Sequence, residues 1–499
     1  MSERDLERVS KRVFLDAWEC DARGWYAARA GDGPAGFGDQ WRFWVGHEVQ
    51  RLAQEWLGAG DLMPLAPIGE ALEATHAAMA TSAANRVFEA TFLADAMVAR
   101  ADALERTGDG WRLIEIKSGK AAEHGKVEKR YIDDVAFTLM VARRAGASIH
   151  EVALVLLNPE YRRGGTEPLF VRVDVTTAAS LRAHQFDARA TALTHAVLEP
   201  ERPPVELRFA CRKCAHYTKQ CVGIGVEDPL WLLPRLSEKR FDAMRSYGRI
   251  RRLPADVELT EPQRRVFDVL RAGKPRQDGR ELTKLLAKVR WPVAYVDFET
   301  VNPALPWFEG GAAHDVLPFQ YSVHLVHTLG GTPEHHEYLA PLEGDWRESF
   351  VERLLQVVQP AASVVVYSSY EKVRLRELAE RFPRHADAID AVIARMFDLE
   401  VVFKQAYWHP GFEGRTSIKR VLPVLVPDET LSYESLPVNN GDDALGLFGL
   451  MRMGALDPMS TTPRREELLR YCALDTLGMV HLHRAVAALM ADTEHAEAE

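Results

Sequence analysis

The N-terminal region has the hydrophobic spacing of helices. Over residues 9–59 the apolar positions recur at intervals of three and four, which places them along one face of an α-helix. A glycine-containing segment, residues 31–38, interrupts this pattern. The sequence therefore predicts a mainly helical region in two parts.

Strand-like patterns begin at residue 86. Residues 87–105 and 111–119 are typical of strands, and the turn-forming run 107–110 separates them, so we expect a hairpin. The pattern then predicts three further elements: a helix over about 126–144, a strand over 151–158 and a helix over about 176–198.

The composition changes over about residues 228–290. This stretch is helix-like and basic, and we place the domain boundary in it; its cations include Arg235, Lys239, Arg240, Arg245, Arg249, Arg251 and Arg252. Beyond it a long helix is predicted from near Thr462 and Pro463, after strands over residues 293–300, 319–328, 334–340 and 363–370. This pattern predicts an α/β fold.

The bulk composition fits a folded chain of more than one domain. With 499 residues, 47% of them apolar and 27% charged, the chain is long enough for at least two hydrophobic cores. It contains no apolar run of about eighteen residues and no secretory pattern at its start, which favours the cytoplasm. The net charge of −10 argues against a generally basic nucleic-acid coat, so any nucleic-acid path is expected to be local.

Glu115 and Lys117 form the first candidate chemical site. They lie two positions apart on a predicted strand, so both side chains leave one face while Ile114 and Ile116 face the core. Asp102, at the end of the preceding strand, can meet Glu115 across the hairpin, and two facing carboxylates favour a divalent cation between them. A lysine beside such a cation suits phosphodiester hydrolysis. The alternative is a surface ion pair without catalysis.

A longer motif resembles the RecB-type branch of the PD-(D/E)XK nucleases: Gly46-His47-Glu48, then Asp102, then Glu115-Ile116-Lys117. The resemblance implies that His47, Asp102 and Glu115 are metal ligands and that Lys117 is the catalytic lysine. That branch usually carries a glutamine and a tyrosine on the following helix. Here Thr138 stands at the glutamine position, and Tyr131 either compensates or packs.

Three of the five cysteines fall within eleven residues, as C-x2-C-x6-C. In so long a chain this spacing indicates metal or cluster ligation and not a disulfide framework. With one upstream cysteine they resemble the iron-sulfur RecB-type nucleases, which implies a structural 4Fe-4S cluster on Cys20, Cys211, Cys214 and Cys221. The alternative is a zinc site that uses His216. Cys472 is expected to be a plain buried thiol.

The second half carries another set of acids. Asp297 and Glu299 alternate on a predicted strand and so share a face. Tyr471 and Asp475 are four apart on the predicted long helix and share a face there. Two more acids come between these pairs in the sequence: Glu371 after an apolar strand, and Asp398 after a helix.

This second set resembles the DEDD exonucleases of the RNase H-like fold, in the variant with a tyrosine four residues before the last aspartate. The resemblance implies two divalent metals, Mg²⁺ or Mn²⁺, with Tyr471 orienting the water; the ligands are Asp297, Glu299, Asp475 and Glu371, with Asp398 as the alternative to Glu371. Three residues at a helix start are expected either to contact phosphate or to be plain surface: Ser417, Lys419 and Arg420. Most of the chain also looks like a bacterial domain of unknown function found fused behind a RecB-type nuclease.

These observations predict an α/β protein in three parts. We expect a RecB-like PD-(D/E)XK nuclease domain with iron-sulfur cysteines over residues 1–228, a basic helical linker over 229–290, and a DEDD-type 3'-5' exonuclease domain over 291–495. The expected partner is DNA, as single strands or ends, because aromatic and basic residues offer stacking and phosphate contacts; RNA stays open. One rival interpretation is a nucleic-acid binding or scaffold protein with decayed nuclease sites. Another is a metal-stapled interaction module without catalysis.

Overall fold

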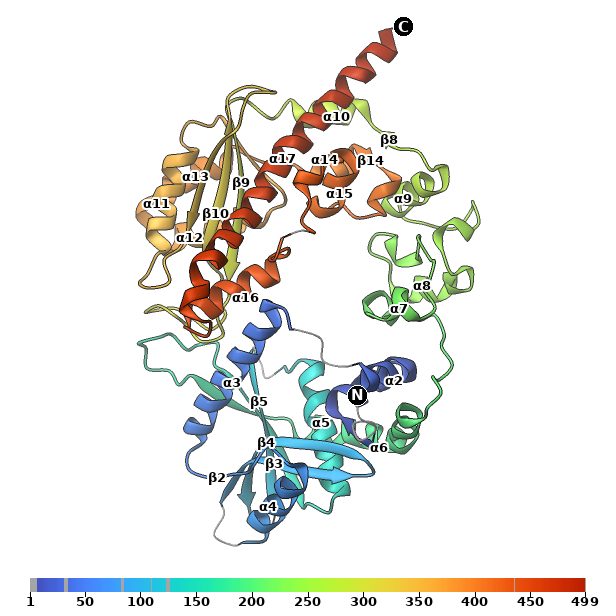
Figure 1. Cartoon of the computed structure of the whole chain (residues 1–499), viewed down its shortest axis with the longest axis vertical. Coiled ribbons are helices and arrows are strands. Elements are labelled where there is room, and N and C mark those ends of the chain that lie inside the picture. The colour runs from blue at the N-terminus through green and yellow to red at the C-terminus, as the bar shows by residue number, and fades with distance from the viewer. Residues whose placement is uncertain are drawn as a thin grey trace.

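The computed structural model describes residues 7–30, 35–81, 85–108, 110–122, 126–434 and 436–498. Within these ranges the protein is a mixed α/β structure with two main sheets. The first sheet and its helices form the first lobe (residues 9–198), and the second sheet and its helices form the second lobe (residues 293–498). In Figure 1 the connecting segment, residues 199–292, runs along one side of the molecule between the lobes. Among the described helices, none combines the length and apolar character that crossing a membrane requires.

The sheet of the first lobe follows the order β2-β3-β4-β5-β6-β7, with β1 beside β4. β3, β4 and β5 form an antiparallel meander, and β6 runs parallel to β5. The strands are β1 Val9–Ser10, β2 Asp61–Leu62, β3 Arg86–Ala94, β4 Met97–Thr107, β5 Gly110–Lys120, β6 Ile149–Leu157 and β7 Phe170–Asp174.

Helices cover both faces of this sheet. One core joins Phe14, Phe137 and Phe186 from three helices to the sheet, whereas a second core joins α3 to Ile114 and Ile116 of β5. Because side chains alternate along β5, Glu115 and Lys117 leave the face opposite to α3. The helices are α1 Lys11–Glu19, α2 Asp21–Arg29, α3 Phe37–Leu57, α4 Ile68–Ala80, α5 Lys129–Arg144 and α6 Thr176–Leu198.

The sheet of the second lobe has the order β11-β10-β9-β12-β13, with β9, β10 and β11 antiparallel and β12 and β13 parallel to β9. Phe298 of β9 packs on one face with Phe350 of α11, and Tyr295 packs on the other with Met479 of α17. The strands are β9 Val293–Val301, β10 Leu317–Val326, β11 Glu334–Leu339, β12 Ser363–Val366 and β13 Met396–Asp398. The helices are α11 Arg347–Val358, α12 Tyr370–Arg381, α13 Ala386–Ala394, α14 Glu400–Gln405, α15 Ile418–Leu425, α16 Gly441–Arg452 and α17 Thr461–Ala498.

The connecting segment contains four short α-helices, and its C-terminal part packs on the second lobe. It contains α7 Tyr217–Gln220, α8 Glu238–Met244, α9 Glu261–Ala272 and α10 Gly279–Leu286. Phe241 and Phe267 belong to a small core of its own. Leu282 and Leu285 of α10 join the core of the second lobe, and β8 Arg276–Gln277 pairs with β14 Tyr407–Trp408.

The two lobes also meet directly, through α3 and α16 (Figure 1). The backbone N–H of Gly38 donates to Asp443 at 3.1 Å, and Arg42 pairs with Asp442 at 2.6 Å. Elsewhere the ring of His314 is 2.6 Å from the carbonyl oxygen of Ser118, the residue after Lys117. The connecting segment is therefore not the only link between the lobes in the described structure.

Residues 87–105 differ from the prediction of one strand, because they form β3 and β4 with a tight turn between them. The turn residues Asp95 and Ala96 have φ of 47° and 64°. Such turns normally carry glycine or asparagine. An alanine there leaves no turn signal in the sequence, which is why the strand pattern reads as continuous.

Candidate metal centre

The acidic centre of the second lobe is built by β9, α12 and α17. Asp297 and Glu299 lie two and four positions after Tyr295 on β9. All three side chains therefore share the face that α17 covers. Asp475 lies on α17 one turn after Tyr471. Ligand oxygens of Asp297, Glu299 and Asp475 all lie within 4.8 Å of one another. The fold thus gathers carboxylates that are far apart in the sequence.

The carboxyl groups of this centre are poorly solvated, with exposed fractions of 8% for Glu299, 3% for Glu371 and 7% for Asp475. Burial and neighbouring carboxylates raise the pKa of Glu299 to about 8 and that of Glu371 to about 7. Burial raises the pKa of Asp475 to about 6. Burial, then Asp475, Glu371 and Glu299, also hold the pKa of Asp297 well above its usual value. Such carboxyls ionise together only if a cation joins them.

Two hydroxyls and one lysine border the acids. Tyr433 donates to Asp475 at 2.6 Å, and Lys419 donates to the hydroxyl of Tyr471 at 2.9 Å. The charge of Lys419 also favours the ionised forms of Glu299 and Asp475. Of the other two residues at this helix start, Ser417 is exposed and Arg420 pairs with Glu413. Lys419 is therefore the member of the predicted phosphate-contact set that faces the centre.

Glu371 and Asp398 occupy different environments. Glu371 lies in the first turn of α12, and its charge raises the pKa of both Asp297 and Glu299. Its Oε2 atom is buried without a hydrogen-bond partner in the described chain. Asp398 instead accepts from the backbone N–H of Glu400 at 2.9 Å, at the start of α14. The geometry therefore favours Glu371 over Asp398 as the third acid.

The donor set of this centre fits hard divalent cations. Every candidate ligand is a carboxylate oxygen, the donor that Mg²⁺ and Mn²⁺ prefer. The unpartnered Oε2 of Glu371 and the raised carboxyl pKa values are the features that a bound cation removes.

A second polar cluster surrounds Glu115 in the first lobe. Its Oε1 accepts from Lys11 of α1 at 2.6 Å and from Lys117 at 3.0 Å, and Lys117 pairs with Asp134 of α5 at 2.6 Å. Burial acts to raise the pKa of Glu115, but the two lysines outweigh it and lower that pKa to about 2. Its Oε2 atom is buried without a hydrogen-bond partner in the described chain. This atom leaves an acceptor for a further cation.

Asp102 lies level with Glu115 on the neighbouring strand. The β4–β5 register pairs Ala103 with Ile114, and one further step brings Asp102 opposite Glu115. Asp102 accepts from the backbone N–H of Ile116 at 2.7 Å. Burial and the charge of Glu115 raise the pKa of Asp102 to about 7.

Glu89 is a third buried carboxylate near this pair, and it accepts from Gln50 and Gln54 of α3; the sequence analysis did not select it. On β3 its neighbours Phe88 and Ala90 pair with Ala103 and Ala101, so Glu89 is level with Asp102. Its φ of 59° interrupts the strand pairing, and burial, with a contribution from Glu115, raises its pKa. The available signal was an acid inside the apolar run VFEATF.

His47 is not gathered with the two predicted acid ligands. It is exposed on α3, the helix on the Ile114 and Ile116 face of the sheet. The ligand atoms of His47, Asp102 and Glu115 do not form a group within 4.8 Å. On α5, Thr138 is fully buried and its hydroxyl donates to the carbonyl of Asp134, while Tyr131 is 8% exposed. Both α5 residues therefore pack in this structure.

The four predicted cluster ligands line one cavity: Cys20, Cys211, Cys214 and Cys221. Cys20 joins α1 to α2, and the other three flank α7. Burial raises the pKa of Cys211, and the other three thiols add to that rise. No three of these sulfur atoms lie within 4.8 Å of one another. Cys472 is buried in the second lobe, where its thiol lies 3.6 Å from a carboxylate oxygen of Asp297.

His216, the alternative zinc ligand, makes other contacts. Its Nδ1 lies 2.8 Å from the side-chain amide of Gln220, and its ring stacks on Tyr26 with centroids 4.7 Å apart. No group of three that includes His216 has its ligand atoms within 4.8 Å.

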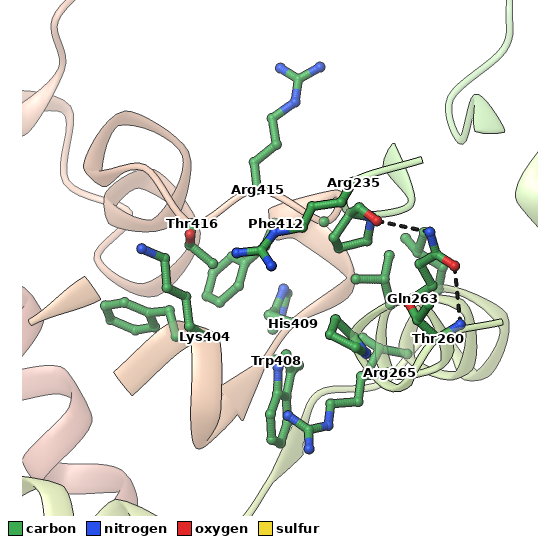
Figure 2. A pocket seen from close by; sticks show the side chains of 17 residues that line it. Arg235, Thr260, Gln263, Arg265, Lys404, Trp408, His409, Phe412, Arg415 and Thr416 are labelled. Carbon is green, nitrogen blue, oxygen red and sulfur yellow. Dashed lines mark hydrogen bonds between the residues drawn. The ribbon is translucent and has the colours of Figure 1, made fainter. Parts of the chain in front are cut away.

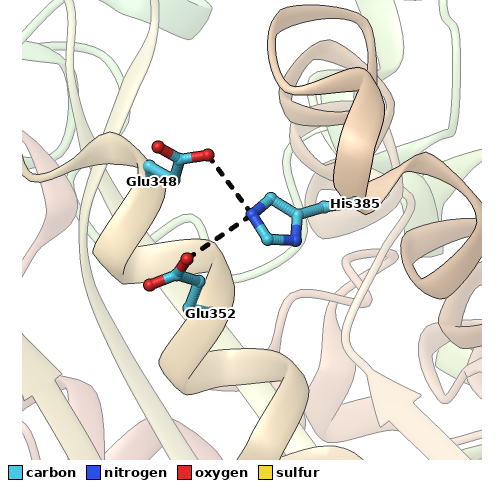
Figure 3. Close-up of side chains that lie close together, drawn as sticks. All are labelled: Glu348, Glu352 and His385. Carbon is cyan, nitrogen blue, oxygen red and sulfur yellow. Dashed lines mark ion pairs between the residues drawn. The ribbon is translucent and has the colours of Figure 1, made fainter.

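A further group of possible ligands lies on the surface of the second lobe. Figure 3 shows Glu348 and Glu352 on one helix facing His385, whose Nε2 is 3.3 Å and 3.8 Å from their carboxylates. Arg384 pairs with both glutamates as well. Because these partners already balance the carboxylates in contact with solvent, the group is a suitable control for the buried centre.

The fold and the acidic centre define a mixed α/β protein with a buried carboxylate site. Residues 294–417 match the model of a family described as "Domain of unknown function (DUF2779)". A segment of 144 residues is 32% identical to the "Uncharacterized protein MG366 homolog" of Mycoplasma pneumoniae and covers 27% of this chain and 22% of that relative. The match thus spans about a fifth of the relative's length. No solved structure matches the chain.

Proposed function

We propose that the second lobe is a metal-dependent phosphodiester hydrolase, an RNase H-like exonuclease of the DEDD type that acts on single-stranded DNA or DNA ends. The observation that carries the proposal is the buried acidic centre, where Asp297, Glu299 and Asp475 meet within 4.8 Å and Glu371 adds an unpartnered oxygen. Gathering buried carboxylates in this way destabilises a fold. Such a group is therefore a candidate functional site.

Each residue of the centre has a distinct role in this proposal. Asp297, Glu299, Glu371 and Asp475 hold the divalent ions, which stabilise charge at the reacting phosphate when bound. Tyr471 orients the attacking water through its hydroxyl, and Lys419 fixes that hydroxyl at 2.9 Å while its charge faces the substrate phosphate. Tyr433 holds Asp475 in place.

A second hydrolytic centre in the first lobe is favoured by Asp102 and Glu115, which lie opposite each other on β4 and β5, with Lys117 beside Glu115. We propose a RecB-like nuclease site there, with the free Oε2 of Glu115 as a metal ligand. A 4Fe-4S cluster on the four cysteines would tie α1 to the connecting segment. The observation that supports this part of the proposal is the common cavity that Cys20, Cys211, Cys214 and Cys221 line.

The proposal is tested with a 5'-labelled single-stranded DNA oligonucleotide. With Mg²⁺ or Mn²⁺, we expect stepwise shortening from the 3' end, which EDTA stops. Asp297→Ala should lower the rate at least a hundredfold, because it removes a metal ligand at the reacting phosphate. Glu352→Gln, which changes an acid of the surface group, should keep the wild-type rate.

Equal rates for Asp297→Ala and wild type, with the Lys117 centre disabled in both, would remove the exonuclease proposal. Tight binding of the oligonucleotide without any cleavage would leave the nucleic-acid binding protein as the better description.

A further inference from the structure

A cavity of about 530 Å³ lies between α9 of the connecting segment and residues 403–416 of the second lobe (Figure 2). Its walls combine two kinds of side chain. Trp408, His409 and Phe412 supply aromatic surface, with Phe412 only 3% exposed. Four cations border this surface: Arg235, Arg265, Lys404 and Arg415.

Two of these four cations are paired with an acid and two are not. Lys404 pairs with Glu400 at 2.5 Å, and Arg265 pairs with Glu261 at 3.1 Å. The guanidinium of Arg265 also lies over the Trp408 ring, 5.0 Å from its centroid. In contrast, the side chains of Arg235 and Arg415 form no hydrogen bond or ion pair within the described ranges of the chain.

Arg235 is held where it faces the cavity. It follows Pro234 and has a φ of 51°, in the left-handed region that non-glycine residues rarely occupy. Figure 2 shows its side chain reaching from the connecting segment across the cavity, while Arg415 extends outward from the opposite wall. Unpaired guanidinium groups beside aromatic side chains suit an anion that is attached to a flat ring.

The cavity is joined to the acidic centre by a short stretch of chain. The hydroxyl of Thr416, at the cavity wall, donates to Glu400 at 2.6 Å, and Tyr367 donates to the Thr416 carbonyl at 2.7 Å. Lys419, three residues further on, contacts Tyr471 of the centre. Residues 415–419 therefore run from an unpaired arginine of the cavity to the lysine of the acidic centre.

We propose that this cavity binds one nucleotide of a single-stranded nucleic-acid substrate, at a distance from the bond that is cut. The base stacks on the aromatic wall, and the adjoining phosphates contact Arg235 and Arg415. Stacking on aromatic side chains tolerates any base, which suits an exonuclease that must pass every sequence. The inference takes its substrate class from the proposed function, and binding can be measured without hydrolysis.

The test is the binding of fluorescein-labelled oligo-dT of about twenty nucleotides to the full chain in EDTA, followed by anisotropy over a range of salt concentrations. Arg235→Ala with Arg415→Ala should weaken binding about tenfold at low salt. The slope of log K against log salt should fall by roughly 0.7 for each lost phosphate contact. Arg245→Ala is the matched control, because Arg245 is an exposed arginine of the same segment that does not line the cavity.

A second substitution tests the base. Trp408→Leu keeps an apolar wall but removes stacking, so it should weaken binding of oligo-dT and leave binding of an abasic strand of equal length unchanged. Equal Kd and salt slope for the double arginine variant and Arg245→Ala would overturn the inference. Binding of free dTMP as tightly as the strand would overturn it too. Wild-type-like strand binding without metal-dependent cleavage would overturn the exonuclease proposal alone.

Discussion

Glu299 keeps its proton to higher pH in the folded protein than in the unfolded chain. Burial and neighbouring carboxylates give it a pKa of about 8, whereas a solvated glutamate titrates near about 4.3. Between these values the folded state binds more protons, so the free energy of unfolding falls as pH rises. In EDTA, Glu299→Gln should therefore raise the thermal midpoint above wild type by a few degrees at about pH 8.5, and by almost nothing at about pH 4.

Comparison with wild type is needed because other buried groups titrate in the same range. Burial lowers the pKa of His324 and His483 to about 4, which makes the free energy of unfolding rise with pH up to the ordinary histidine value. Wild type and Glu299→Gln both carry these histidines, so the histidine contributions cancel and the difference reports on Glu299 and the carboxylates that it contacts electrostatically. Glu352→Gln should show no pH-dependent difference. A constant offset between Glu299→Gln and wild type from about pH 4 to 8.5 would contradict the assigned pKa.

Residue spacing was informative where partners share one element or lie on the two strands of one hairpin, as Asp102 and Glu115 do. The period of a strand places Asp297 with Glu299, and the period of a helix places Tyr471 with Asp475. Tyr433 reaches Asp475 across 42 positions of sequence, and Lys11 reaches Glu115 across 104. No local pattern encodes such contacts, because they depend on how complete elements pack.

The prediction of helices and strands succeeded where the period of a single element is visible in the sequence. Amphipathic periods predicted the helix over 176–198 and the strands β9, β10 and β11 close to their observed bounds. The strand run 87–105 was wrong at its Asp95 turn, where the backbone adopts positive φ without a glycine. The short strand β13 and helix α16 were not predicted, because their burial depends on tertiary packing.

The cysteines give a prediction at the scale of elements, because they connect the α1–α2 junction to α7. We expect anaerobically purified protein to be brown, with the broad visible absorption of iron-sulfur charge transfer. Cys20→Ser should reduce this absorption and lower the thermal midpoint, since the first helices lose their link to a segment almost two hundred residues away. Absorption spectra and iron analysis are the measurements.

Cys472→Ser is the control for the cluster, because Cys472 is buried in the second lobe and should leave the absorption unchanged. Colourless protein with one equivalent of zinc would refute the cluster. So would a Cys20→Ser variant with the absorption and the stability of wild type.

At the scale of the whole molecule, the lobe contact depends on glycine at α16. A Cβ at Gly446 would lie 2.3 Å from the carbonyl oxygen of Phe37 and 2.6 Å from the nitrogen of Gly38, both backbone atoms of α3. Gly446→Ala must therefore move α3 away from α16. We expect a loss of about 1–3 kcal/mol in the free energy of unfolding and a larger radius of gyration in X-ray scattering.

Gly46→Ala is the matched control, because a Cβ at Gly46 of α3 meets nothing within 4 Å. Alanine is the better helix former, so this variant should be slightly more stable than wild type. An unchanged midpoint and radius for Gly446→Ala would show that α16 can shift without loss of the contact.

The two proposed centres should act independently, although the lobes touch. Lys117 and Glu115 make their ion pairs with Lys11 and Asp134 of the first lobe, whereas Asp297 meets Glu299 and Asp475 of the second lobe. The His314 contact to Ser118 involves a backbone carbonyl and supplies no ligand from one lobe to the centre of the other.

Asp297→Ala should therefore abolish stepwise 3' digestion and leave any cutting that depends on Lys117 unchanged, whereas Lys117→Ala should do the reverse. Product ladders from 5'-labelled linear and circular single strands separate the two activities, since a circle offers no end. If Lys117→Ala slows 3' digestion of the linear strand as much as Asp297→Ala does, the lobes form one catalytic unit and the model of two centres fails.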